Sequence, residues 1–127
     1  MDKEFVPYEQ ASQLKELGFD YKCLLSYIDE ILCFPQELYG NLDTCSFNSN
    51  NDTMYENEIS APLYQQAFKW FRNKDIVIDI SNHDNNVYEY YIKWSTTKSI
   101  LSDIYTTYEE TQLECLKRLI KIIKNNE

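Results

Sequence analysis

Apolar residues recur at helical spacing in three segments of the chain. Residues 8–17, 62–73 and 108–124 each place apolar side chains three or four positions apart, with polar residues between them. This is the period of an amphipathic helix that buries one stripe. The pattern therefore predicts three helices, of which the last is the most regular.

Residues with known helix-end preferences stand at the borders of these segments. Pro7 suits a helix start, because proline has no backbone N–H to leave unpaired there. Gly18 suits the position just after a helix end. Ser60 is the expected N-cap of the second helix. Thr107 and Glu110 have the spacing of a capping box ahead of the third.

Strand-like patterns fill the intervals between the helices. Residues 21–28 and 31–34 are apolar runs separated by Asp29-Glu30, which predicts a hairpin with a tight turn. Residues 76–80 and 87–94 alternate apolar and polar side chains, as strands with one buried face do. The polar stretch between them, 81–86, is the expected connection.

Together these elements predict an α+β fold. Three helices pack on a small antiparallel sheet of two hairpins, in the order α-ββ-α-ββ-α. The chain of 127 residues is expected to form a single domain, 1–127, with a long acidic loop at about 40–58. Loops of that length are usually functional or mobile.

Composition narrows the function classes. Two glycines cannot supply a glycine-rich phosphate-binding loop. No apolar run approaches the roughly 18 residues of a membrane span. The first residues, MDKEFVPYEQ, lack the basic and apolar regions of a signal peptide. A cytoplasmic location is therefore expected.

Charge is distributed unevenly along the chain. Residues 1–60 hold 12 acidic and 3 basic residues, whereas residues 61–127 hold 9 of each. No Lys or Arg occurs from Cys23 to Phe68, a stretch with 7 acids. Such asymmetry bears on partners: it favours a basic protein surface and disfavours direct binding of nucleic acid, which needs clustered Lys and Arg.

Aromatic residues interleave with the acids of this stretch, and aromatic anchors are common at protein interfaces. We therefore expect a partner-binding surface in this part of the chain. Its predicted residues are Asp29, Glu30, Glu37, Tyr39, Asp43, Asp52, Tyr55, Glu56 and Glu58. The alternative is an acidic surface that only aids solubility.

The sequence gives little support for disulfide bonds, metal binding or catalysis. The four cysteines show no CxxC and match no zinc spacing, so free thiols are expected, with Cys115 facing the core. The single histidine, His83, lies near Ser81 and Asp84 in a stretch typical of turns, and sequence adjacency does not make a catalytic triad. The acidic loop lacks the calcium-loop pattern and its glycine. We expect no catalytic residues, metal or cofactor.

Three stretches resemble a family of small proteins common in bacterial phages and prophages. They are FVPYEQASQLKELGFD, ISAPLYQQAFKWFR and TYEETQLECLKRLIKII, which correspond to the three predicted helices and recur in this order in the family. The resemblance brings no assigned activity and no functional residues. It implies a phage-borne accessory protein, a group that includes inhibitors of host defence such as anti-CRISPR proteins.

Charge and resemblance together suggest a non-enzymatic inhibitor. The expected partner is a basic host protein that handles nucleic acid, such as an RNA-guided nuclease, with no membrane or free nucleic acid involved. One alternative is a small homo-oligomeric scaffold or regulator in phage replication or assembly. Another is an enzyme that uses paired carboxylates.

Overall fold

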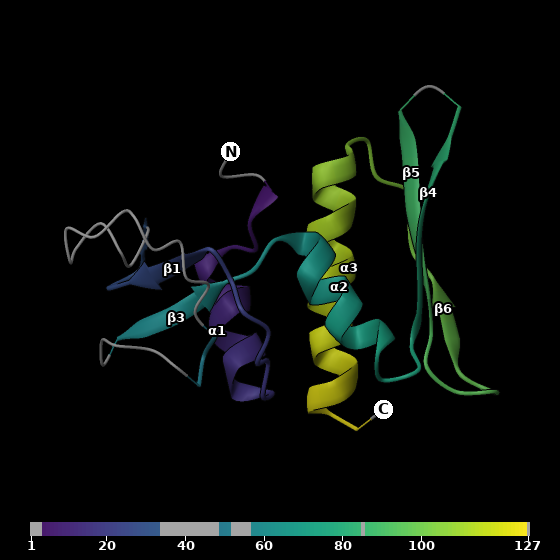
Figure 1. The fold of residues 1–127 in the computed structure, drawn as a ribbon. Helices are drawn as coiled ribbons and strands as arrows, with labels where there is room; N and C mark the ends of the chain where they lie inside the picture. Colours follow the sequence, from purple (N-terminus) through teal and green to yellow (C-terminus); the bar gives the residue numbers. More distant parts are fainter. Residues whose placement is uncertain (1–3, 34–48, 52–56, 85, 127) are drawn as a thin grey trace. The chain divides into compact units, whose positions relative to one another are not determined.

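The computed structural model describes residues 4–33, 49–51, 57–84 and 86–126, and Figure 1 shows its helices and strands. The elements are α1 (Tyr8–Glu16), β1 (Leu25–Ile28), β2 (Ile31–Cys33), β3 (Glu58–Ala61), α2 (Tyr64–Arg72), β4 (Val77–His83), β5 (Val87–Lys93), β6 (Ser99–Leu101) and α3 (Tyr108–Lys124). The chain divides into two compact units, Met1–Gln66 and Ala67–Glu127.

The predicted α+β class is confirmed, but the strands are arranged differently. Two three-stranded antiparallel sheets replace the expected pair of hairpins, with orders β2-β1-β3 and β4-β5-β6. The additional strands are β3 and β6. Ser60 pairs with Ser26 in the first sheet, so it is a strand residue and not the N-cap of α2. The second hairpin also extends further than expected, because β4 continues to His83.

The first unit joins α1 to its sheet through buried aromatic and apolar side chains. Helix α1 contacts β3 and buries Ala11 and Leu14. The Tyr27 hydroxyl donates to the backbone oxygen of Val6 at 2.7 Å. The rings of Tyr27 and Tyr8 meet edge to face, 5.6 Å apart. The sheet therefore has one face closed by α1 and the segment that leads into it.

The predicted end of α1 is confirmed in detail. Gly18 has φ of +95°, a conformation that side chains with a Cβ rarely adopt. Phe19 N donates to Leu14 O at 2.9 Å, and Gly18 N donates to Lys15 O at 3.0 Å. These two bonds are the paired closures of a Schellman motif, and they use carbonyls that the helix end would otherwise leave unpaired.

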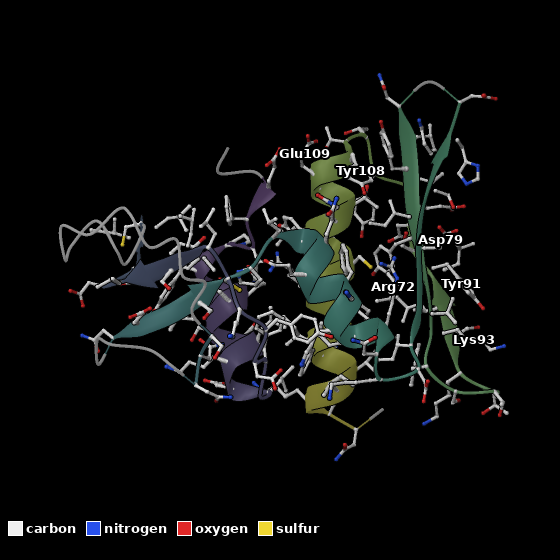
Figure 2. All side chains as sticks on the ribbon, viewed as in Figure 1. Arg72, Asp79, Tyr91, Lys93, Tyr108 and Glu109 are labelled. Carbon is white, nitrogen blue, oxygen red and sulfur yellow. The ribbon has the colours of Figure 1, made fainter. Side chains whose placement is uncertain are left out.

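The second unit packs α3 on one face of its sheet, as Figure 1 shows. The register pairs Ile78 with Ile92 and Ile80 with Tyr90, so alternate residues share the covered face. Ile78, Tyr90 and Ile92 are buried there. Asp79, Tyr91 and Lys93 belong to the opposite face and point away from α3 in Figure 2. The predicted alternation is therefore confirmed.

The predicted N-cap of α3 is confirmed. Thr107 has an extended backbone, and its hydroxyl accepts from Glu110 N at 3.2 Å. The helix buries Leu116, Leu119, Ile120 and Ile122 together with Cys115, which confirms that Cys115 faces the core. None of the helices in the described segments is long and apolar enough to cross a bilayer.

Burial raises the pKa of several acidic groups in the core. The pKa of Cys23 and of Cys115 rises from 9.0 to about 12. The pKa of Tyr64 and of Tyr90 rises from 10.0 to about 12. Below the unfolded-state pKa the folded and the unfolded chain both hold these protons, so the contribution of each buried group to the free energy of unfolding is complete there. It is lost as the pH rises toward 12, where only the unfolded chain ionises freely.

We therefore expect the free energy of unfolding to fall between pH 9 and pH 12. Tyr90→Phe should make this fall shallower, because one ionising group is removed. Urea denaturation in reductant, across this pH range, measures the effect, and Tyr91→Phe on the opposite face is the matched control for loss of a phenol hydroxyl. Equal pH dependence in wild type and Tyr90→Phe would contradict this account.

Candidate partner-binding surface

The hairpin turn between β1 and β2 presents two carboxylates side by side. Asp29 and Glu30 connect Ile28 to Ile31, which pair directly with each other. Both turn residues have positive φ, 51° and 69°. Two positive φ values are typical of the type I′ turn, whose twist matches that of the flanking strands. Asn-Gly is the favoured pair in such turns, so this acidic pair is an uncommon choice.

Both turn residues are exposed, and they differ in their contacts. Asp29 Oδ1 accepts a hydrogen bond from Asn57 Nδ2 at 3.0 Å. This contact ties the turn to the residue before β3. Glu30 has no hydrogen bond or ion pair to any residue of the described ranges. Its carboxylate is therefore available to a cationic group from outside.

A hollow of about 350 Å³ lies beside this turn. Its walls come from α1, the turn and the start of β3. The lining residues are Tyr8, Lys15, Asp29, Glu30, Asn57 and Ile59. Lys15 Nζ donates to the backbone oxygen of Glu58 at 3.1 Å, which holds its charge against β3. The hollow thus combines an aromatic wall with the exposed carboxylates, and it could receive a side chain from a partner.

Glu58 does not belong to this surface, although the sequence suggested it. It is fully buried in β3, and its Oε2 accepts from Ser26 Oγ at 2.9 Å. The expectation that Glu58 contacts a partner does not fit this burial. A strand of four residues with Ile59 between two inward-facing positions places Glu58 on the buried face. A charged residue there must be hydrogen-bonded, because an unpaired buried charge is costly.

The remaining predicted residues of the acidic surface lie outside the described ranges. They are Glu37, Tyr39, Asp43, Asp52, Tyr55 and Glu56. Of the predicted set, the structure therefore places Asp29 and Glu30 together on the surface and Glu58 in the interior.

The region around His83 is a pair of antiparallel strands, β4 and β5. His83 Nε2 lies 2.6 Å from Glu89 Oε1 on the neighbouring strand. Ser81 Oγ points to Asp79 Oδ2, at 3.5 Å, and Asp84 follows in the turn. In the segments that the structure describes, no group of three His, Cys, Asp or Glu residues could hold a metal ion.

Sequence reasoning did not foresee the contributions of Tyr8, Lys15 and Asn57 to the hollow. Tyr8 and Lys15 are seven positions apart and so lie on one face of α1. Their spacing in the sequence is therefore the one local signal for this wall of the hollow. The bond from Asn57 to Asp29 joins residues 28 apart and has no local signal.

Comparison with known proteins found no matching family model, no similar curated protein and no similar solved structure. The resemblance to phage proteins therefore stays a prediction from the sequence.

We expect Ser26→Ala to destabilise the fold by about 1–3 kcal/mol, because it removes a hydrogen-bond donor from a buried carboxylate. Ser99→Ala, at an exposed strand position, is the matched control and should change stability by less than about 0.5 kcal/mol. Chemical denaturation measures both. If the two variants were equally stable, the Ser26–Glu58 bond would have no role in holding β1 to β3.

Proposed function

We propose that this protein is a non-enzymatic binding protein whose acidic surface, the Asp29-Glu30 turn with its adjoining hollow, engages a basic surface on a partner protein. The supporting observation is the exposed acidic turn within a stretch, Cys23 to Phe68, that has no Lys or Arg. The charge of Glu30 is not neutralised by a described neighbour. Opposite charges steer such surfaces together and set their orientation.

The chemistry of the hollow suits a lysine or arginine side chain. Glu30 supplies a free carboxylate at its rim, and Tyr8 supplies an aromatic wall along which an aliphatic stem can lie. Exposed ion pairs contribute only modest energy, so affinity must come from several such contacts. An acidic surface with aromatic anchors meets that need.

The finer proposal rests on the resemblance to phage proteins. In this proposal the partner is a host protein that handles nucleic acid, such as an RNA-guided nuclease, and the present protein inhibits it. Such nucleases carry basic grooves for their guide and target strands. An acidic protein can occupy a groove of that kind by imitating the charge of a nucleic acid.

The decisive variant is Asp29→Asn with Glu30→Gly. It removes both charges and installs the residue pair that this turn geometry prefers, so the fold should be at least as stable as wild type. Binding to a basic partner should weaken by at least about tenfold, because charge complementarity is lost at the centre of the surface. Inhibition of an RNA-guided nuclease, measured as target cleavage at increasing protein concentration, is the readout.

The matched control is Asp84→Asn with Asp103→Asn, which removes the same number of charges from exposed positions in the second unit. It should inhibit as wild type does. Equal inhibition by the turn variant and wild type would show that the acidic turn is not the contact. Absence of inhibition by wild type would contradict the nuclease proposal itself, while a pull-down with basic proteins would still test the surface.

Free nucleic acid should not bind to this protein at physiological salt. The chain has a formal charge of −9, and duplex and single strands are bound through clustered cations. A gel-retardation assay with free RNA and DNA measures this. A low-micromolar affinity for either would argue against an acidic protein that competes with nucleic acid.

A further inference from the structure

Strand β4 is an outer strand of the second sheet, so the backbone groups of every second residue face away from β5. Tyr88 N donates to Tyr105 O, and Tyr90 N donates to Ser102 Oγ, so these two residues of β5 direct their backbone away from β4. Their partners across the ladder are Asn82 and Ile80. Two residues that lie opposite each other in an antiparallel ladder either bond to each other or both direct their N–H and C=O groups away from each other. Ile80 and Asn82 therefore offer their N–H and C=O groups to the open edge.

Only the first part of this edge is covered. Arg72 Nη2 donates to Ile78 O at 3.0 Å, which occupies one outward carbonyl. The outward backbone groups of Ile80 and Asn82 have no hydrogen bond to any residue in the described part of the second unit. Asn82 is exposed and Ile80 half-buried. Four residues, from Ile80 to His83, thus form an uncovered strand edge.

The outer edge of β3, in the first unit, is covered by hydrogen bonds from the same chain. Lys15 Nζ donates to Glu58 O, Asn50 Oδ1 accepts from Ser60 N, and Val6 N donates to Pro62 O. Three successive outward positions along that edge are therefore satisfied within the chain. Proteins usually block exposed strand edges in such ways, because a free edge pairs with other strands. The open part of β4 contrasts with this closed edge of β3.

We propose that β4 pairs antiparallel with β4 of a second copy of this chain, with Ile80 opposite Ile80 at the two-fold axis. All seven residues of the strand then have a partner. The two copies of Ile80 exchange backbone hydrogen bonds across the interface, and so do Ile78 and Asn82. The bond from Asn82 N–H uses the second lone pair of the Ile78 carbonyl, which already accepts from Arg72 within its own chain. The two sheets join into one continuous sheet, and α3 of each copy covers the same face of it.

The charges along β4 favour this register. With Ile80 at the axis, Asp79 lies opposite Ser81 of the second copy, and Val77 lies opposite His83 of the second copy. A serine hydroxyl can donate to the facing carboxylate. A register centred on Asp79 would oppose two carboxylates, which is destabilising. A register centred on Ser81 would pair fewer residues of the strand. This surface is distinct from the acidic turn, and the proposal does not depend on the proposed function.

The first experiment measures the oligomeric state by sedimentation velocity, from low micromolar to about 100 µM protein. Wild type should shift from monomer to dimer over this range. Asn82→Pro should weaken the dimer by at least about tenfold, because it removes an outward N–H twice by symmetry. Proline is tolerated at edge positions whose N–H is not used within the sheet. Asn82→Ala keeps the backbone donor and is the matched control, expected to dimerise as wild type does.

The second experiment tests the register and stays informative if Asn82→Pro fails to fold. In the proposed dimer, Asp79 of one copy faces Ser81 of the second copy as a non-hydrogen-bonded pair. The Cα atoms of such a pair are about 4.5 Å apart, which is close enough for a disulfide. The double variant Asp79→Cys, Ser81→Cys should form a covalent dimer under mild oxidation. Ser81→Cys alone is the control and should cross-link no more than wild type, because each Ser81 faces Asp79.

The two experiments together distinguish pairing through β4 from association through another surface. A concentration-dependent dimer that Asn82→Pro weakens, with cross-linking confined to the double variant, supports the proposal. A wild type that remains monomeric at about 100 µM overturns it, because an edge that pairs should do so there. A dimer that the folded Asn82→Pro variant retains, or one that Ser81→Cys alone captures, also overturns it, since another surface or register would then be used.

Discussion

The need to satisfy backbone hydrogen bonds at the strand edges constrains both units of this protein. Three-stranded sheets have two edges each, and small sheets cannot hide them inside a barrel. In the first unit Lys15, Asn50 and Val6 complete the outer edge of β3. In the second unit Arg72 covers only the start of β4. The first unit therefore has a closed edge there, and the second offers part of one to another strand.

The acidic turn is a consequence of the same sheet architecture. A tight turn joins β1 to β2 with two residues, so both side chains must face solvent at the tip of the hairpin. Asp29 and Glu30 occupy backbone conformations that suit Asn and Gly better. Residues with a Cβ are strained at positive φ, so an acidic pair in this turn costs some stability. The chain thus places two negative charges next to each other at the tip of the hairpin.

Local signals in the sequence predicted much of the fold. The Schellman end at Gly18, the Thr107 cap and the alternation in β4 and β5 all depend on residues within a few positions of one another. The wrong predictions concern residues whose structure depends on pairing with residues far away in the sequence. Ser60 looked like a helix cap, but pairing with Ser26 makes it a strand residue. Glu58 looked like a surface acid, but the same pairing buries it next to that serine. For the site, the turn was foreseen and the hollow was not.

Amide hydrogen exchange along β4 tests most directly the claim that its free edge pairs with a second copy. Asp79 and Ser81 face β5, so their amides should exchange slowly at every protein concentration. Ile80 and Asn82 should exchange rapidly in dilute protein and become protected as the concentration rises. Rapid exchange of Ile80 and Asn82 at all concentrations, with Asp79 and Ser81 protected, would contradict the account, because the edge would then be open and unpaired.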